Sequence, residues 1–279
     1  GAAGGVVNII TGAGDTGELL VDHDDVDKVA FTGSTAVGKA IARTIAGTRK
    51  KATLELGGKA ANIVFDDAPI DQAIEGVDNG IFFNQGHVCC AGSRLLVQES
   101  AHHQLVERLK VRMTTLRVRD PLDRNTDVGA VNSQRQLTRI AGLVEEGERS
   151  GATVWSPPVT LPEQGYWFAP TVLTEVSGSH RVVREEIFGP VLTVQTFRTP
   201  QEAVAKANNT PYGLSAGVWT DKGSRILWMA DRLRAGVVWA NTFNVFDPAS
   251  PFGGYAESGF GREGGRQGLA GYVRTGDDR

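Results

Sequence analysis

The hydrophobic pattern along the chain alternates between two periods, and this alternation predicts the architecture. Short runs of apolar and β-branched residues, which are typical of buried strands, recur between segments whose apolar residues follow helical spacing. Strands that alternate with helices in this way favour an α/β fold with largely parallel sheets. The strands are expected at residues 5–10, 26–32, 51–56, 61–65, 94–98, 169–176, 190–197, 215–220 and 236–241.

The helical segments show apolar residues three and four positions apart, and several end at a glycine. No internal repeat is visible, and the Pro- and aromatic-rich residues 161–170 are expected to form a surface excursion. A change of role near Gly57-Gly58 gives the predicted domain boundary. The helices are expected at residues 36–47, 69–83, 100–116, 133–151, 200–209 and 221–236.

Composition and charge exclude several classes of protein. The 279 residues are enough for a large hydrophobic core, so the fold requires no disulfide or metal. A net charge of −3 offers no field for nucleic acid or an anionic membrane surface. No apolar run approaches the roughly 20 residues that span a bilayer, and the first residues lack the pattern of a signal peptide. We therefore expect a cytoplasmic protein with no nucleic-acid or membrane partner.

Both cysteines of the chain are adjacent, in the segment FFNQGHVCCAGSR that runs from Phe82 to Arg94. A disulfide between neighbouring cysteines is strained. Zinc sites use C-x-x-C or paired histidines, and the five histidines show no such spacing, so we predict no metal site. The residues alone leave two interpretations open, a catalytic nucleophile and a pair of small core residues.

Glycine is abundant, with 35 residues, and two glycine clusters are candidates for holding phosphate. Residues 12–17, GAGDTG, lie between a predicted strand and the helix-like residues 18–23, and they match the G-x-G-x-x-G pattern of dinucleotide-binding turns, although an ordinary turn between strand and helix fits equally well. In FTGSTAVG, Gly33 and Gly38 lie between a predicted strand and the first turn of a helix, where backbone N–H groups attract phosphate oxygens. Each cluster is compatible with a nucleotide, and neither decides the question.

Five longer motifs occur together: FTGSTAVGK, LELGGK, FFNQGHVCCAGSR, EEIFGPV and PFGGYAESGFGRE. In this order they resemble the aldehyde dehydrogenase superfamily, over essentially the whole chain, and most closely its hydrolytic, NAD(P)-dependent members. The resemblance implies the end of a Rossmann-type cofactor domain at residues 1–57 and an α/β catalytic domain at residues 58–257. Residues 258–279 would lead to the oligomerisation strand of a homodimer or homotetramer.

The resemblance also implies an aldehyde substrate and a catalytic pair. Cys89 matches the family nucleophile, which attacks the aldehyde and passes through a thiohemiacetal to a thioester. Glu55 matches the general base that activates water to hydrolyse this thioester. Without the motifs, Cys89 would more often be a core residue and Glu55 a residue facing solvent.

The remaining carried-over residues concern NAD or NADP and the substrate. Phe246 and Phe252 resemble walls of the aldehyde pocket, whereas the GAGDTG turn resembles a loop near the adenine, which is a lesser role than its pattern suggests. The residues implied to contact the cofactor are Gly33, Ser34, Gly38, Leu56 and Gly57, together with Glu186 at the nicotinamide ribose and Phe188 beside the nicotinamide.

The chain departs from the family pattern in several places. Complete members carry an upstream Pro-Trp-Asn motif, whose Asn donates to the oxyanion, and we expect this chain to be the C-terminal portion of a longer protein that alone catalyses poorly. His87 occupies a position where glutamine is common, and one hypothesis is that it perturbs the Cys89 thiolate. Ala256 replaces a frequent lysine, and residues 272–279 are less strand-like than usual.

Two alternative functions remain open at this point. The first is a CoA-acylating semialdehyde dehydrogenase, which Glu55 disfavours because acyl transfer to CoA needs no base for water. The second is a catalytically silent scaffold of aldehyde dehydrogenase type, which the retention of Cys89, Glu55, Glu186 and Phe188 disfavours.

Overall fold

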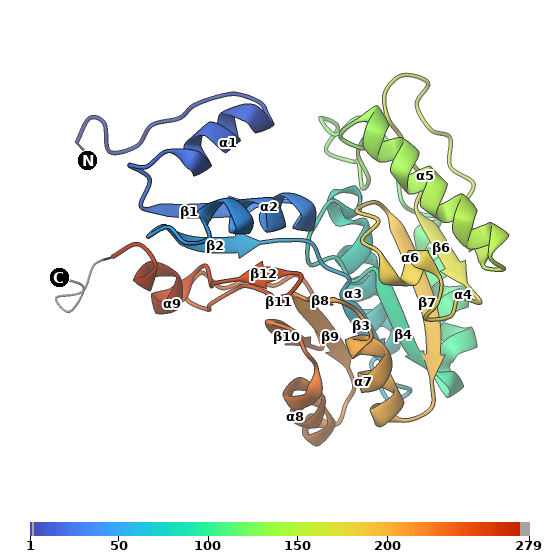
Figure 1. The fold of residues 1–279 in the computed structure, drawn as a ribbon. Coiled ribbons are helices and arrows are strands. Elements are labelled where there is room, and N and C mark those ends of the chain that lie inside the picture. The colour runs from blue at the N-terminus through green and yellow to red at the C-terminus, as the bar shows by residue number, and fades with distance from the viewer. Residues whose placement is uncertain (2, 274–279) are drawn as a thin grey trace.

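The computed structural model describes residues 1 and 3–273, which form two main sheets, of three and seven strands, that meet near Gly57 (Figure 1). A separate two-stranded sheet lies beside them. The smaller main sheet is built from the first part of the chain, where β1 and β2 run parallel with Thr32 opposite Glu55. Ser34 caps α2, because its Oγ accepts a hydrogen bond from the Val37 N–H. This N-terminal part consists of α1 (Gly14–Asp22), β1 (Lys28–Thr32), α2 (Thr35–Ile45) and β2 (Lys51–Glu55).

The strand predicted at residues 5–10 is wrong. These residues form turns and irregular backbone, and Ile9 is 89% exposed. A strand is stable only where a neighbouring strand satisfies its backbone groups, and the described residues place none beside this segment. As a result GAGDTG does not follow a strand, and α1 begins within it at Gly14.

The larger sheet has the strand order β10-β9-β3-β4-β7-β6-β5. All its neighbouring pairs are parallel except β5 with β6 at one edge, which confirms the predicted α/β class. Its strands are β3 (Ala61–Val64), β4 (Arg94–Gln98), β5 (Thr153–Trp155), β6 (Thr171–Thr174), β7 (Val191–Phe197), β9 (Ser215–Trp219) and β10 (Val237–Ala240).

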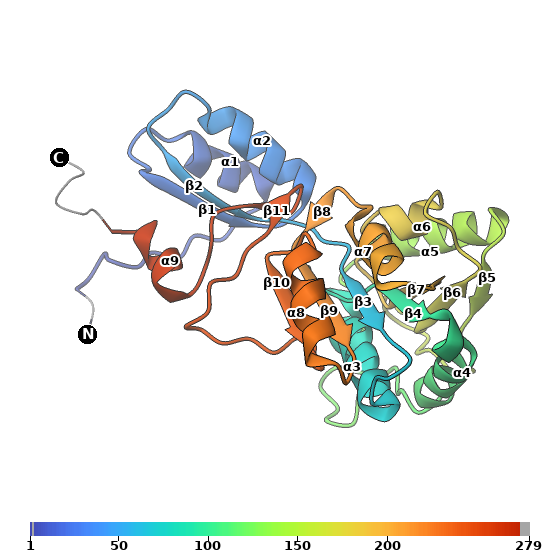
Figure 2. The same cartoon turned by 90° about the horizontal axis from the view of Figure 1, so that it is seen from below.

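Successive strand residues point to opposite faces of this sheet, and each face has its own apolar core. Val64 and Leu95 pack with α3 and α4, whereas Ile63 and Leu96 pack with α7 and α8. Figure 2 shows where these helices lie around the sheet. Helix α5 covers the end of the sheet near β5 and β6, together with α6. The helices are α3 (Ile70–Phe82), α4 (His102–Met113), α5 (Gln134–Arg149), α6 (Arg181–Arg184), α7 (Pro200–Asn208) and α8 (Gly223–Arg232).

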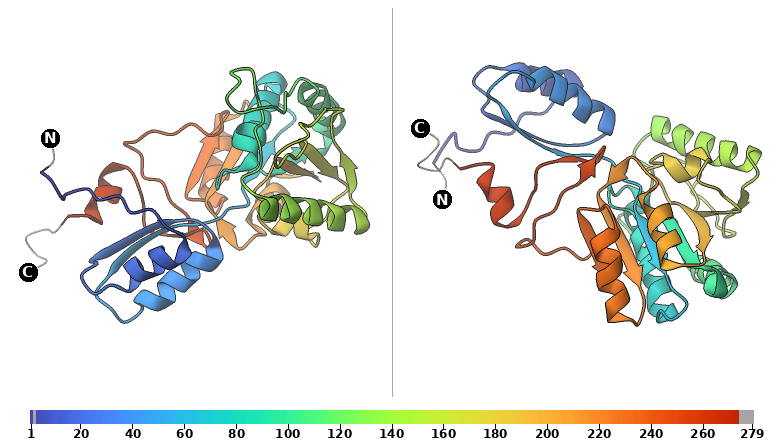
Figure 3. Two further views of the ribbon diagram at one scale, coloured as in Figure 1. Left: turned by 90° about the horizontal axis from the view of Figure 1, so that it is seen from above. Right: turned by 60° about the horizontal axis from the view of Figure 1, so that its bottom comes forward.

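The C-terminal part returns to the N-terminal sheet. Strand β12 (Gly259–Phe260) pairs antiparallel with β2, so that Gly259 lies opposite Glu55. Figure 3 shows this red segment beside the blue N-terminal elements, at the opposite end of the molecule from α5. The same part contains β11 (Tyr255–Ala256), which pairs with β8 (Tyr212–Gly213), and α9 (Gly265–Ala270).

Most predicted elements are confirmed, with ends that shift by a few residues. The sequence pattern missed β5, β8, β11, β12, α6 and α9, which have six residues or fewer. Residues 272–279 were expected to be less strand-like than the usual closing segment of the family. Of these, residues 274–279 lie outside the described part. Within the described part, no helix has the length and apolar character needed to cross a bilayer. The proposed domain boundaries stay predictions.

Ser258 connects the end of β2 to β8 through its side chain, which is fully buried. Its Oγ donates to the Gly57 carbonyl at 2.7 Å and accepts from the Gly213 N–H at 3.0 Å. Its carbonyl also accepts a hydrogen bond from the Leu56 N–H at 3.1 Å. One serine therefore holds the end of β2, β8 and the returning C-terminal segment together.

Replacing Ser258 with Ala is expected to lower the free energy of unfolding by about 1–3 kcal/mol, because a buried carbonyl and a buried N–H lose their partner. Urea denaturation followed by circular dichroism measures this change. Ser224→Ala, an exposed substitution in α8, serves as the control and should stay within about 0.5 kcal/mol of wild type. Equal stability of the two variants would contradict the role given to Ser258.

Candidate active site

A cavity of about 810 Å³ lies where the two sheets meet. Its walls come from the end of β1 and the start of α2, the end of β2, the cysteine segment, the start of α5 and the segment after α6. Of the predicted site residues, the cavity brings together Gly33, Ser34, Glu55, Leu56, Gly57, Cys89, Glu186 and Phe188.

Cys89 is presented by a tight turn that follows α3. In η1 (Phe83–Gly86), which is one turn of 3-10 type, Asn84 and Gln85 have positive φ angles of 49° and 47°. Gly86 has φ +72° and lies against the Gly189 carbonyl, so a side chain there would collide with backbone. The chain is therefore forced into a compact path that leaves Cys89 half-buried at the cavity wall.

The two cysteines have different environments, and both are free thiols. The Cys90 thiol donates a hydrogen bond that lowers the pKa of Cys89, and backbone N–H groups act in the same direction, whereas burial and Glu186 oppose them. The pKa of Cys90 is raised, first by this hydrogen bond and then by burial. The single proton of Cys90 serves either Cys89 or Asn244 Oδ1, which lies 3.4 Å away. Cys89 is thus the thiol prepared to ionise.

Glu55 ends β2 and is 7% exposed, with no hydrogen bond to either carboxylate oxygen within the described residues. Its pKa is raised to about 7, because burial penalises the charged form and nearby Cys89 and Glu263 add negative charge. Arg262 partly opposes these effects. A buried carboxylate with free oxygens and a pKa near neutrality is typical of a general base.

Glu186 reaches the cavity across the Gly57-Gly58 connection. Its Oε1 accepts a hydrogen bond from the Gly58 N–H at 2.9 Å, and a Cβ on Gly57 would collide with the same carboxylate. A Cβ on Gly58 would collide with the Cys89 carbonyl. Burial raises the pKa of Glu186, while Gly58 N–H, Lys59 and Arg139 oppose this. The two glycines thus let Glu186 and Cys89 approach the end of β2 together.

The FTGSTAVG segment contributes the start of α2 to the cavity. Gly33 and Ser34 line it, and the Gly33 N–H donates to the Glu55 carbonyl at 3.0 Å. Gly38 is not among the lining residues, because it is buried in α2 against the side chain of Leu56. Its lack of a side chain allows α2 to lie close to β2, so Gly38 shapes the wall from behind.

The three aromatic residues predicted to contact cofactor or substrate lie in two different places, one in the cavity wall and two outside it. Phe188 lines the cavity in a left-handed backbone conformation, with φ +55°. Phe246 and Phe252 instead form an edge-to-face pair with ring centroids 5.3 Å apart, and neither lines this cavity. Phe252 packs on the same apolar core as Cys89, whereas Phe246 is 55% exposed.

Several cavity residues were missed from the sequence. The start of α5 was predicted as a helix, but its polar side chains received no role. The available signal was Ser133, a typical helix N-cap, whose Oγ accepts from the Gln136 N–H. The missed lining residues include Asn132, Ser133, Arg135, Gln136, Arg139 and Tyr212.

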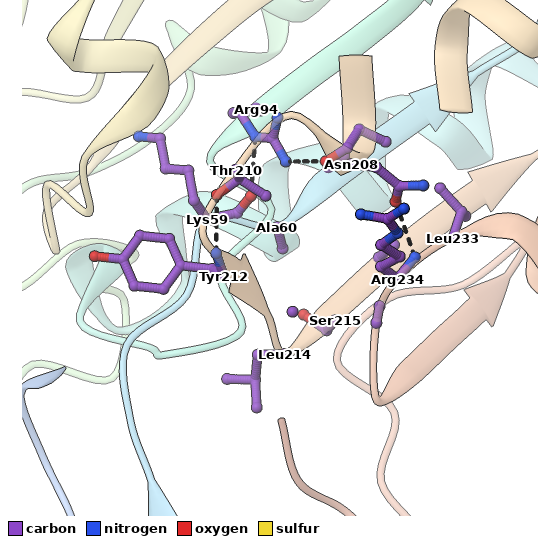
Figure 4. Close-up of a pocket in the computed structure, with 15 residues that line it drawn as sticks. Lys59, Ala60, Arg94, Asn208, Thr210, Tyr212, Leu214, Ser215, Leu233 and Arg234 are labelled. Atoms are coloured by element: carbon purple, nitrogen blue, oxygen red, sulfur yellow. Dashed lines mark hydrogen bonds between the residues drawn. The ribbon is translucent and has the colours of Figure 1, made fainter. Parts of the chain in front are cut away.

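Two buried cations, Lys59 before β3 and Arg94 at the beginning of β4, line a second, small pocket (Figure 4). Arg94 is satisfied, since its guanidinium donates to the carbonyls of Lys59, Lys206 and Ala207. Lys59 extends away from Arg94, and its Nζ has no hydrogen-bond partner within the described part of the chain. Burial, and then Arg94, lower the pKa of Lys59 to about 7. The described residues contain no cluster of three or more His, Cys, Asp or Glu side chains that could hold a metal ion.

Relatives of the chain support the resemblance seen in its motifs. A relative from Alternaria alternata, an aldehyde dehydrogenase, is 46% identical over 273 residues, which are 97% of this chain and 55% of the relative. An aldehyde dehydrogenase from Emericella nidulans is 45% identical over 276 residues, covering 98% of this chain and 56% of the relative. The chain therefore spans about half the length of these curated relatives.

Solved structures share the fold. The NAD-dependent aldehyde dehydrogenase from Sinorhizobium meliloti superposes with a TM-score of 0.92 at 43% identity, over 95% of this chain and 53% of that one. Betaine aldehyde dehydrogenase from Staphylococcus aureus, solved in complex with NAD+, gives 0.91 at 38% identity, over 95% and 54%. The sequence profile of the aldehyde dehydrogenase family matches residues 1–276, and the chain belongs to this family.

Proposed function

We propose that the complete protein oxidises an aldehyde to a carboxylic acid with NAD+ or NADP+, using Cys89 as nucleophile and Glu55 as general base. The observation that carries this proposal is the convergence of a thiol with a lowered pKa and a carboxylate with a raised pKa on one cavity. A thiol whose pKa is lowered ionises more readily, and a carboxylate whose pKa is raised is a better proton acceptor. Such shifted pKa values are typical of catalytic sites.

The cavity fits a dinucleotide. Gly33 and Ser34 precede α2, whose first-turn N–H groups have no partner within the helix and, with the helix dipole, favour the oxygens of a pyrophosphate. The Gly33 N–H itself is bound to the Glu55 carbonyl. Glu186 is a half-buried carboxylate whose Oε1 is bound to the Gly58 N–H, and its Oε2 could accept hydrogen bonds from ribose hydroxyls. Phe188, which lines the same cavity as Cys89, offers an apolar wall to a nicotinamide ring, and Leu56 and Gly57 also line this cavity. When bound, this cofactor supplies the acceptor for the hydride of the substrate carbon.

The first half of the proposed reaction depends on the Cys89 thiolate. The thiolate forms a bond to the aldehyde carbon, and the carbonyl oxygen becomes an oxyanion, giving a thiohemiacetal. The backbone N–H of Cys89 can stabilise this oxyanion. Loss of a hydride from the same carbon leaves a thioester on Cys89, at the oxidation level of the acid.

The second half depends on Glu55. The ionised carboxylate takes a proton from water, and the resulting hydroxide attacks the thioester carbon and releases the Cys89 thiolate. One aldehyde, one oxidised cofactor and one water give one acid, one reduced cofactor and one proton. A pKa near 7 allows Glu55 to accept this proton and lose it again near neutral pH.

The setting proposed for the complete protein follows the family resemblance. We propose a homodimer or homotetramer in the cytoplasm, acting on a small-molecule aldehyde. This chain, with a net charge of −3, contributes no broad positive field for nucleic acid.

Replacing Cys89 with Ala in the complete protein is expected to abolish aldehyde-dependent NADH formation, because the change removes the proposed nucleophile. Cys90→Ala should keep activity but raise the pKa of Cys89, since the hydrogen bond that most lowers it is removed. The rate of iodoacetamide alkylation against pH measures this shift. Cys90→Ser, which retains a donor, is the matched control and should move the profile less than Cys90→Ala. Equal loss of activity in Cys89→Ala and Cys90→Ala would contradict the assignment.

Hydrolysis of the thioester is expected to accelerate about tenfold between pH 6 and pH 8, because the fraction of ionised Glu55 rises through its pKa of about 7. Glu55→Gln should slow hydrolysis by about 10²-fold or more and remove this pH dependence. The measurement follows decay of the acyl-enzyme formed from a chromogenic ester without cofactor. Glu145→Gln, an exposed change on α5, is the control. A rate that is independent of pH in the wild-type protein would argue against Glu55 as the base.

A further inference from the structure

His87 lies directly behind Phe188. The two rings are stacked, with centroids 5.1 Å apart and planes inclined by 10°. Phe188 lines the cavity, whereas His87 is not among the lining residues. The imidazole therefore supports the wall of the cavity from the protein side and does not contact the cavity itself.

A hydrogen bond joins the same ring to the start of α5. The Asn132 N–H donates to His87 Nε2 at 3.3 Å, and Asn132 lines the cavity. Because Nε2 accepts this bond, the proton of the neutral ring resides on Nδ1. Nδ1 is buried, and burial lowers the pKa of His87, whereas an interaction of the ring with the Phe188 backbone opposes this effect. The neutral ring is thus the form that the structure favours.

Hydrogen bonds fix the position of His87, whereas the backbone conformation of Phe188 is unfavourable and has to be enforced by its neighbours. The His87 N–H donates to the Asn84 carbonyl at 2.9 Å, and Asn84 Nδ2 donates to the His87 carbonyl at 3.1 Å. Phe188 adopts φ +55°, which is unfavourable for a residue with a bulky side chain and persists only where its surroundings enforce it. Gln136 Nε2 donates to the Phe188 carbonyl at 2.9 Å, so the backbone is fixed and the ring depends on the stack.

We propose that His87 is a positioning residue, which holds the Phe188 ring and the Asn132 backbone at the cavity wall in register with Cys89. His87 and Cys89 are separated by one residue, so a single turn carries both the nucleophile and the support of the aromatic wall. The inference rests on the proposed function, because it assigns Phe188 to the nicotinamide end of the cofactor. It replaces a direct action of His87 on the Cys89 thiolate with an action through Phe188.

The two contacts of the ring can be separated by substitution. His87→Gln can still accept from the Asn132 N–H but removes the stacked ring, and glutamine is the residue common at this position in the family. His87→Phe keeps a stacked ring but removes the acceptor. His87→Ala removes both, and His103→Ala, an exposed histidine on α4, is the matched control.

Hydrogen exchange in the complete, cofactor-free protein tests positioning without any turnover. We expect the backbone amides of residues 185–191 to exchange about three- to tenfold faster in His87→Ala and His87→Gln, because loss of the stacked ring makes local opening more frequent by about this factor. His87→Phe keeps a stacked ring and should not show this increase. The Asn132 amide should instead exchange faster in His87→Ala and His87→Phe. Unchanged thermal unfolding identifies these as local effects, and the Gln and Phe variants keep the comparison available if His87→Ala fails to fold.

Kinetics with NAD+ supply the second readout. His87→Ala should lose about tenfold in kcat with less change in the KM for aldehyde, because a displaced wall misaligns the reacting groups. His87→Phe should recover most of this loss. If wild type forms NADH while exchange at residues 185–191 and kcat are the same in His87→Ala as in His103→Ala, this inference alone is overturned. If wild type forms no NADH with any aldehyde, the proposed function falls and the inference falls with it.

Discussion

The close approach of three chain segments at Gly57-Gly58 is the constraint on which the site depends. A side chain at Gly57 would occupy the place of the Glu186 carboxylate, and one at Gly58 would collide with the Cys89 carbonyl. Ser258 then fixes this junction by binding the Gly57 carbonyl. The cavity therefore exists because two adjacent residues have no side chain, and because a third residue keeps their backbone in place.

The buried carboxylate of Glu55 at this junction lowers the stability of the fold, but its environment suits the role of a general base. Glu55 is buried without a hydrogen bond to its carboxylate in the described part of the chain, and its nearest charged influences are mostly negative. Such a group destabilises the folded state when it is ionised, since desolvation is not compensated. The surrounding sheet pairing, in which Gly259 lies opposite Glu55, holds this strained arrangement in place.

Local patterns predicted the long elements well, because each long helix or strand buries one face and its apolar residues therefore recur with the period of that element. The pattern failed at residues 5–10, where apolar side chains are present but no neighbouring strand is. Cys89 and Glu55 were assigned through family motifs, and the raised pKa of Glu55 depends on neighbours distant in sequence, such as Glu263. The ligand contacts expected of Gly38, Phe246 and Phe252 stay predictions, because Gly38 packs against Leu56 and the two rings pair with each other outside the described cavity.

The pairing of β12 with β2 has a consequence for biosynthesis. Glu55 and Gly259 are about 200 residues apart, and contacts of such long separation form late because the closure of large loops is entropically costly. On the ribosome, the strand that carries Glu55 emerges long before its antiparallel neighbour. The buried carboxylate thus stays in contact with water during most of translation, and a chain truncated before Gly259 cannot complete its enclosure.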